Sequence, residues 1–340
     1  MRGRASLSIL APEPSPTIAG AAPYPTPFQG ATFSREGRRG APLGKALAIL
    51  AGLAAISVPV PVLAHATAVD AFYERAVMTA ADQHCRLFTP ELGSALQASE
   101  AQARGAALRS GLKDAILDQV EQRADAKIAA TPCGSPDIAT AATRVRAAFD
   151  GYSKLQRMSY PGEIADWTAD RSTSRRVAIW KLSQTDQFDG SRLVFGLAGG
   201  DGPSSLVAVA VFADGAQPYA ARLVVRDVSL APDAFINGIH AGPGKTPLSA
   251  RTPPRSATKA FMAEARGNAD ATLLPYGARQ GVAFRFPKAA AQTLSGLDPR
   301  EAVAIDFLFA GANGVEQVRT AYVEVGDFAA GRAFLASAQR

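Results

Sequence analysis

The residues Gly244-Lys245-Thr246 have the composition of the end of a phosphate-binding loop. Such a loop has a further glycine five positions earlier, so that its backbone N–H groups curl around the phosphates, and a helix follows it. Ile239 occupies the position of that glycine, and Pro247 directly follows the triplet, which disfavours a helix. We therefore interpret residues 238–257 as an irregular loop and expect no nucleotide ligand.

Histidines, which most nucleophilic and zinc sites require, are scarce in this chain. It has three, of which His84 precedes a cysteine and His240 lies in the Gly/Pro-rich loop. No G-x-S-x-G, H-E-x-x-H or strand-linked G-x-G-x-x-G motif is present. We expect His240 to be an ordinary loop residue, the alternative being a base or metal ligand at the rim of a site. No catalytic residue, metal or cofactor is predicted.

Charged residues on the predicted strands suggest two further kinds of chemistry. Asp306 and Glu324 would form a carboxylate pair of the glycosidase type if they faced each other on neighbouring strands. A basic face, able to bind a carboxylate, phosphate or acidic partner surface, would result if four outward-alternating residues lay on adjacent strands. The alternative is a solvated sheet face balanced by acidic residues. The four are Lys181, Arg222, Arg226 and Arg285.

Cys85 and Cys133 are the only two cysteines. In an oxidising compartment an even count of two permits one disulfide. A redox pair would have the spacing C-x-x-C, and a zinc site would need two more ligands. We therefore predict a structural disulfide between Cys85 and Cys133.

The N-terminal segment has the order of features of a secretory signal peptide. Arg35, Arg38, Arg39 and Lys45 precede the uncharged run 46–63, and Ala64-His65-Ala66 forms an A-x-A cleavage site. We predict that residues 1–66 are a leader, in which a disordered extension precedes a signal peptide at 45–66 and cleavage leaves a periplasmic protein. The alternative is an uncleaved anchor at residues 46–64, with both domains displayed outside.

The leader also accounts for most of the positive charge. The full chain has 36 basic and 30 acidic residues, and residues 1–66 contain six of the basic and two of the acidic ones. The remaining chain is therefore nearly neutral and lacks the domain-scale basic surface of a nucleic-acid-binding protein. We expect no nucleic acid partner.

The periodicity divides the remaining chain into a helical part at 67–158 and a strand-rich part at 159–340. Apolar residues at helical spacing predict four Ala-rich helices: one over 69–84, one beginning near Leu92, one through 108–128 with a break near Gly105 or Gly111, and one beginning at Pro136. Short β-branched runs between turn residues predict an antiparallel β-sandwich. The predicted strands are 177–182, 192–197, 206–213, 221–228, 282–286, 303–309 and 318–325, with short helices at 289–294 and 328–338. The fold class is thus α+β, a helical bundle followed by a sandwich and a short C-terminal helix.

Three stretches carry a resemblance to known proteins: RLVFGLAG, VAIDFLF and VEVGDFAAGRAFL. With the signal peptide and the Ala-rich helices, they resemble uncharacterised exported proteins of alphaproteobacteria. The last hundred or so residues resemble the small β-sandwich proteins of the invasion-associated locus B type. The resemblance implies a periplasmic, non-enzymatic protein and transfers no catalytic residue. We expect an envelope-associated binding or assembly protein, with an envelope protein or an anionic ligand as partner. The alternative is a hydrolase that acts on an envelope polymer through paired carboxylates.

Overall fold

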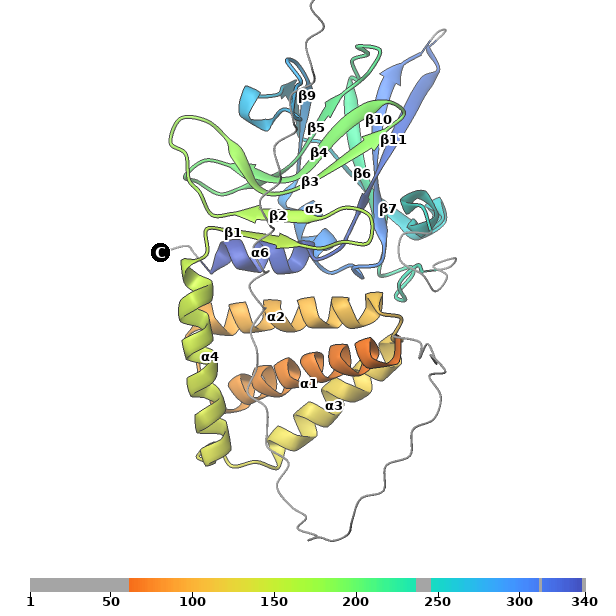
Figure 1. The fold of residues 1–340 in the computed structure, drawn as a ribbon. Helices are drawn as coiled ribbons and strands as arrows, with labels where there is room; N and C mark the ends of the chain where they lie inside the picture. The colour runs from red at the N-terminus through yellow and green to blue at the C-terminus, as the bar shows by residue number, and fades with distance from the viewer. Residues whose placement is uncertain (1–60, 237–245, 312–313, 338–340) are drawn as a thin grey trace, which may run out of the picture.

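The computed structural model describes residues 61–236, 246–311 and 314–337. Four helices come first, two antiparallel sheets follow, and a short helix ends the fold (Figure 1). This arrangement confirms the predicted α+β class. The predicted boundary at 158/159 lies inside the first strand, since helix gives way to strand between Lys154 and Arg157.

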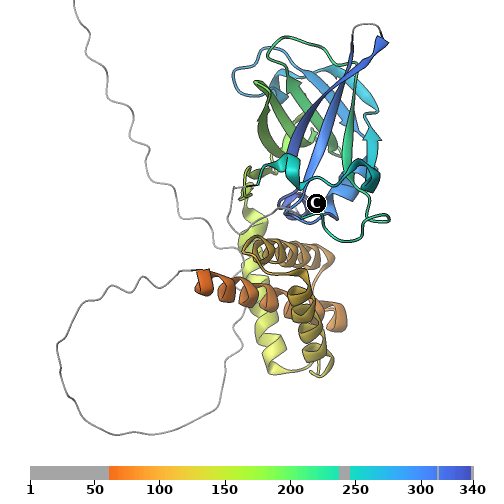
Figure 2. The ribbon, with the colours of Figure 1, turned by 90° about the vertical axis from the view of Figure 1, so that its right-hand side faces the viewer.

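The helical part consists of α1 (Pro61–Cys85), α2 (Pro90–Arg109), α3 (Asp114–Ala129) and α4 (Pro136–Lys154). α1 packs between α2 and α3, while α4 runs steeply across their ends (Figures 1 and 2). The interior consists of small separate clusters, one of which joins Phe72 of α1 to Leu108 of α2 and Leu117 of α3. Ten of the buried positions described in these helices are alanines. Since alanine buries little apolar area, the bundle gains only modest hydrophobic stabilisation per residue.

The helix ends follow the local sequence signals. The predicted break comes at Gly111, which has a φ of 98°, a conformation that a side chain disfavours. Gly105 lies inside α2 instead, so that helix continues through Leu108 to Arg109. Pro136 occupies the start of α4 and Ser135 precedes it, as predicted.

The predicted disulfide is present. Cys85, at the end of α1, is bonded to Cys133 in the loop between α3 and α4, with 5.6 Å between the Cα atoms. The bond closes a loop with a sequence separation of 48 residues. In the chain-entropy model such a loop contributes about 4 kcal/mol by restricting the unfolded chain. The disulfide therefore adds stability to a bundle whose alanine-rich interior provides little hydrophobic stabilisation.

The strands form two sheets, and every pairing within them is antiparallel. One sheet has the order β1-β2-β3-β4-β5-β9-β8 and the other β11-β10-β6-β7. The bounds are β1 (Arg157–Tyr160), β2 (Trp167–Asp170), β3 (Ile179–Phe188), β4 (Ser191–Gly199), β5 (Ser205–Val211), β6 (Ala220–Arg226), β7 (Thr258–Met262), β8 (Ala265–Asn268), β9 (Val282–Phe286), β10 (Ala302–Ala310) and β11 (Glu316–Glu324). All seven predicted strands occur, and the structure adds the four short strands β1, β2, β7 and β8.

A single large core fills the space between the sheets. Phe284, Phe307 and Trp167 are fully buried there, and Trp167 packs edge-on against Phe328. β5 is covered on both faces, as its continuous apolar run predicts. Its outer face lies under Leu273, which belongs to the 3-10 helix η3 (Ala271–Leu273).

The strand-rich part also contains two short α-helices, one between β9 and β10 and one after β11. α5 (Lys288–Ser295) and α6 (Phe328–Ala336) agree with the helices predicted at 289–294 and 328–338. Part of the predicted loop 238–257 is also described: it forms the 3-10 helices η1 (Leu248–Arg251) and η2 (Arg255–Ala257). Gly244, Lys245 and His240 lie outside the described residues.

The predicted leader lies mostly outside the described residues. Ala64 and Ala66, the predicted cleavage residues, belong to the first turns of α1. Within the described part of the chain, none of the helices combines the length and the apolar character needed to cross a membrane.

The bundle contains a carboxyl group that makes stability depend on pH. Burial raises the pKa of Glu100 on α2 from its ordinary 4.5, and the nearby carboxylates of Glu121 and Asp125 raise it further. The folded state thus binds this proton more tightly than the unfolded state does. The contribution of Glu100 to stability is therefore most favourable below pH 4.5 and is lost as the pH rises through the raised pKa.

We predict that Glu100→Gln removes this part of the pH dependence. The free energy of unfolding, measured by urea denaturation from pH 4 upwards, should fall less steeply with pH in the variant than in the wild type. Glu264→Gln, at an exposed position, is the matched control and should keep the wild-type slope. Equal slopes for wild type and Glu100→Gln would contradict the assignment.

Candidate ligand pocket between the bundle and the sandwich

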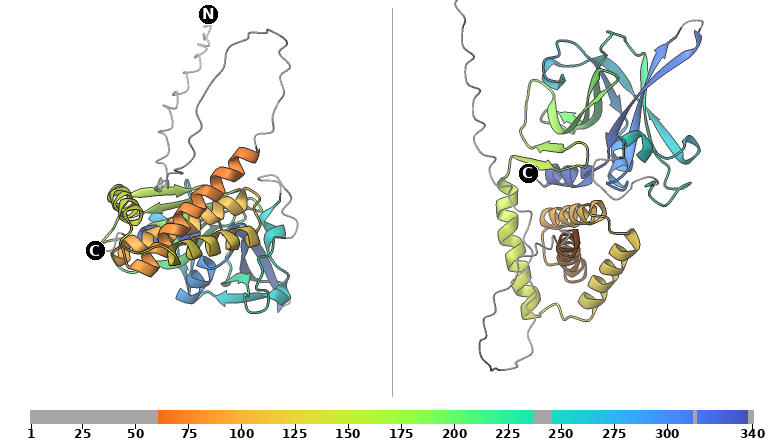
Figure 3. Two further views of the ribbon diagram at one scale, coloured as in Figure 1. Left: turned by 90° about the horizontal axis from the view of Figure 1, so that it is seen from below. Right: turned by 45° about the vertical axis from the view of Figure 1, so that its right-hand side comes forward.

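The C-terminal helix α6 connects the two parts of the molecule. It lies between α2 of the bundle and the strands β2 and β3 of the larger sheet (Figures 1 and 3). Its first residue, Phe328, is fully buried in the sandwich core, so α6 is anchored in the sheets while its other side faces α2. The helix therefore packs against the larger sheet on one side and against the bundle on the other.

A buried ion pair joins α2 to the residue before α6. Arg109, the last residue of α2, donates two hydrogen bonds to the Asp327 carboxylate, at 2.9 and 3.0 Å. The side chain of Asp327 is 3% exposed and that of Arg109 is 14% exposed. Burial raises the pKa of Asp327, and the Arg109 guanidinium opposes this rise. Removing one partner of such a pair typically costs about 3–5 kcal/mol, because the other charge stays buried without compensation.

A second set of ion pairs crosses the junction at the start of α3. Asp114 accepts from Arg104 of α2 at 3.0 Å and from Arg300 of the sandwich at 2.8 Å. Arg300 also binds Asp298 at 2.7 Å, and Arg104 binds Asp118 at 3.0 Å. These charges thus neutralise one another across the two halves and hold the loop before β10 against α2 and α3.

Gly105 permits the close approach of α2 to this loop. A Cβ atom at this position would lie 3.0 Å from Asp327 Oδ1 and 3.2 Å from Pro299 Cγ. Both distances are shorter than ordinary van der Waals contact. Since the Asp327 carboxylate is fixed by Arg109, the space at Gly105 cannot be enlarged without disturbing the ion pair.

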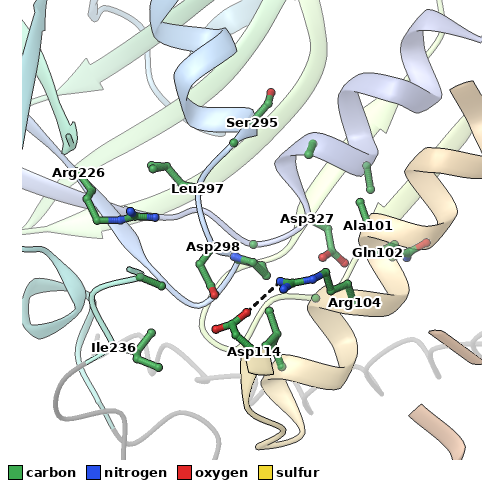
Figure 4. A pocket seen from close by; sticks show the side chains of 18 of the residues that line it. Ala101, Gln102, Arg104, Asp114, Arg226, Ile236, Ser295, Leu297, Asp298 and Asp327 are labelled. Carbon is green, nitrogen blue, oxygen red and sulfur yellow. Dashed lines mark ion pairs between the residues drawn. The ribbon is translucent and has the colours of Figure 1, made fainter. Parts of the chain in front are cut away.

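A pocket of about 570 Å³ lies at this junction (Figure 4). Its size is within the usual range for sites that bind small molecules. α2 and the start of α3 form one side, and the sandwich contributes the end of β6, the segment 232–236, the turn 295–299 and residues 326–330. Apolar side chains such as Leu108, Ile236 and Leu297 alternate along the wall with charged ones.

Arg226, at the end of β6, places a guanidinium in this pocket. The residue is 4% exposed, and Figure 4 shows its side chain directed toward the pocket. Its Nε donates to Glu301 Oε1 at 2.7 Å, and its Nη1 donates to the carbonyls of Ala231 and Pro232 at 2.6 and 2.8 Å. Its Nη2 has no hydrogen-bond partner among the described residues. Burial raises the pKa of Glu301, with the Arg226 charge opposing the rise.

Two other polar side chains of the wall have unused hydrogen-bonding capacity. Gln102 of α2 and Asp233 of the segment after β6 line the pocket, and within the described part of the chain neither side chain has a hydrogen bond or ion pair. By contrast, the carboxylates of Asp114, Asp298 and Asp327 are all bound to arginines. The wall therefore offers one guanidinium nitrogen, one amide and one carboxylate to a ligand.

The predicted basic face is wrong. Arg222 and Arg226 lie on the smaller sheet, whereas Lys181 and Arg285 lie on non-adjacent strands of the larger one. Lys181 is the extra residue of a β-bulge, and its buried side chain donates to the Ser172 carbonyl. Arg222 is bound to Asp306 at 2.9 Å. Only Arg285 is exposed as predicted.

The facing pair of carboxylates is also wrong. Asp306 lies opposite Thr320 in the β10–β11 register, four residues from Glu324 along β11. Asp306 accepts from Arg222 and Thr320. Glu324, which is fully buried, accepts from the backbone N–H groups of Glu163, Ile164 and Ala165. Both carboxylates thus have structural roles, one within the smaller sheet and the other in fixing the β1–β2 loop.

Among the described residues, His84, Cys85 and Cys133 form a group whose ligand-type atoms lie within 4.8 Å of one another. The two sulfur atoms are bonded to each other. Since metal binding requires thiolates, the group is a disulfide with an adjacent exposed histidine.

Most residues of the pocket have no recognisable motif in the sequence. Gln102, Asp233 and Asp298 come from segments far apart along the chain, and no spacing rule connects them. The sequence predicts the strand position of Arg226, but its role in the pocket depends on Glu301, 75 residues away. Comparison with protein-family models, curated proteins and solved structures gave no significant match.

We predict that Gly105→Ala lowers the free energy of unfolding by about 1–3 kcal/mol, because the new methyl group overpacks the junction. Gly151→Ala is the matched control, since a Cβ at this position in α4 meets no atom within 4 Å. The control should raise stability by about 0.5–1 kcal/mol, the usual gain for alanine in a helix interior. Urea denaturation measures both effects. Equal stabilisation by the two substitutions would show that the junction is not closely packed at Gly105.

Proposed function

We propose that this protein is an exported, non-enzymatic binding protein of the periplasm or cell envelope, which holds a small polar ligand in the pocket between its two halves. The observation that carries the proposal is the composition of the pocket wall. Most charged side chains of the wall are paired with one another. Arg226, Gln102 and Asp233 still have polar groups that form no hydrogen bond with the described residues.

The construction of the wall favours binding. Bidentate and shared ion pairs fix the positions of α2, α3 and the turn at Asp298 before any ligand arrives. A site that is ordered in advance loses little conformational entropy on binding. A mixture of apolar surface and a few convergent polar groups is typical of small-molecule sites.

Two features support export. The N-terminal sequence has the features of a signal peptide. The Cys85–Cys133 disulfide is compatible with an oxidising compartment, where such bonds persist.

Blocking the pocket with a large side chain tests whether it is the ligand site. Ala101 of α2 is exposed and lines the pocket, whereas Ala106 is exposed on the same helix and does not line it. A library of small polar solutes would be screened by protein-observed ¹H–¹⁵N NMR. We predict that the binders shift resonances of residues 101–105, 226, 232–236 and 295–299, that Ala101→Trp abolishes these shifts, and that Ala106→Trp leaves them unchanged. Solutes that bind elsewhere, or equally well to Ala101→Trp, would refute the pocket as the ligand site.

Export is tested by the intact mass of the protein purified from a periplasmic extract. We predict a chain that begins at Thr67, two hydrogens lighter than its reduced form, with two thiols that react with an alkylating reagent only after reduction. A mass that includes residues 1–66, or two thiols that react without reductant, would contradict the proposed compartment and processing.

A further inference from the structure

We infer that the ligand of this pocket is a zwitterion, a small molecule with a carboxylate and an ammonium group close together, as in a free amino acid. Arg226 would bind the carboxylate and Asp233 the ammonium. The inference rests on the proposed function, since it specifies the ligand of the same pocket.

The donor is the free edge of Arg226. Nε and Nη1 are occupied by Glu301 and by two backbone carbonyls, and within residues 61–236, 246–311 and 314–337 the N–H groups of Nη2 have no acceptor, so they can bind a ligand. Because three contacts hold the guanidinium and the residue is 4% exposed, it is oriented before binding. An ionised carboxylate accepts a charge-assisted hydrogen bond from a guanidinium N–H, which is roughly twice as strong as a hydrogen bond between neutral groups.

The acceptor is Asp233, which is close to Arg226 in the sequence. Nη1 of Arg226 donates to the carbonyl of Pro232, the residue directly before Asp233, at 2.8 Å. Even so, Asp233 forms no ion pair with Arg226 or with any other cation in the described ranges. Arg226 and Asp233 line the same pocket but do not pair with each other. A ligand with one negative and one positive group can therefore bind between them.

The charge balance of the remaining wall argues against a ligand with net charge. Arg226 is neutralised by Glu301, Asp327 by Arg109, and Asp114 and Asp298 by Arg104 and Arg300. Asp233 adds an unpaired negative charge, so a net anion would be desolvated beside this carboxylate, whereas a simple cation would leave the Nη2 N–H groups of Arg226 without an acceptor among the described residues. A zwitterion adds no net charge, and both of its charged groups gain a partner. Leu108, Ile236 and Leu297 then supply apolar contact for a side chain.

The test is isothermal titration calorimetry of the full protein with the twenty standard L-amino acids, with D-glucose as a neutral polyol for comparison. For the amino acid that binds best, the amine without its carboxylate and the acid without its amine are titrated as well; for L-leucine these are isopentylamine and 4-methylpentanoate. We expect at least one amino acid to bind, and both truncated analogues to bind at least about 10-fold more weakly, because each leaves one charged group unpaired.

Asp233→Asn tests the ammonium site without disturbing the fold, since Asp233 is exposed. It should weaken amino acid binding at least about 10-fold and leave the affinity for the acid analogue unchanged. Asp270→Asn, another exposed aspartate, which does not line the pocket, is the control and should bind as the wild type does.

Three results would overturn the inference: no amino acid binds, a truncated analogue or glucose binds as tightly as the amino acid, or Asp233→Asn has no effect. If another solute still binds and Ala101→Trp abolishes its binding, the proposed function stands without the zwitterion. If no solute binds at the pocket, both proposals fail.

Discussion

The buried ion pair between Arg109 and Asp327 is the interaction on which the arrangement of the two halves depends. It joins the last residue of α2 to the residue before α6, at a sequence separation of 218. Because Asp327 is almost fully buried, its charge requires a partner at that place, and the Arg109 guanidinium at the end of α2 donates to both carboxylate oxygens. The pair thereby fixes where α2 packs against α6. Gly105, one turn earlier, allows the two backbones to come close.

The pocket is a consequence of this junction. α2 and α3 face the turn at Asp298 across a gap that neither apolar core fills, and ion pairs line it because the segments that meet there are rich in arginine and aspartate. Most of these charges are satisfied within the protein. The groups that remain, on Arg226, Gln102 and Asp233, come from different elements, so a ligand bound there would contact both the bundle and the sandwich.

The elements with strong local signals were predictable from the sequence. Alternation identified β9 to the residue, continuous apolar runs identified β5 and β10, and the pair of cysteines identified the disulfide. β8, with the sequence ARGN, is exposed throughout and owes its pairing to β9 rather than to its own residues. The site was largely unpredictable, because it depends on contacts between distant segments. Alternation gives the side of a strand on which Arg226 or Lys181 lies, but not the bulge at Lys181 or the glutamate that covers Arg226.

We expect the bundle and the sandwich to form one cooperative unit, whose junction shapes the pocket. Differential scanning calorimetry of the full chain tests it most directly. A single transition is expected, with a calorimetric enthalpy equal to the van't Hoff enthalpy, because the buried ion pairs couple the unfolding of the two halves. Two separate transitions, one for the disulfide-linked bundle and one for the sandwich, would contradict it, since a junction that opens before either half unfolds would not hold a preformed pocket.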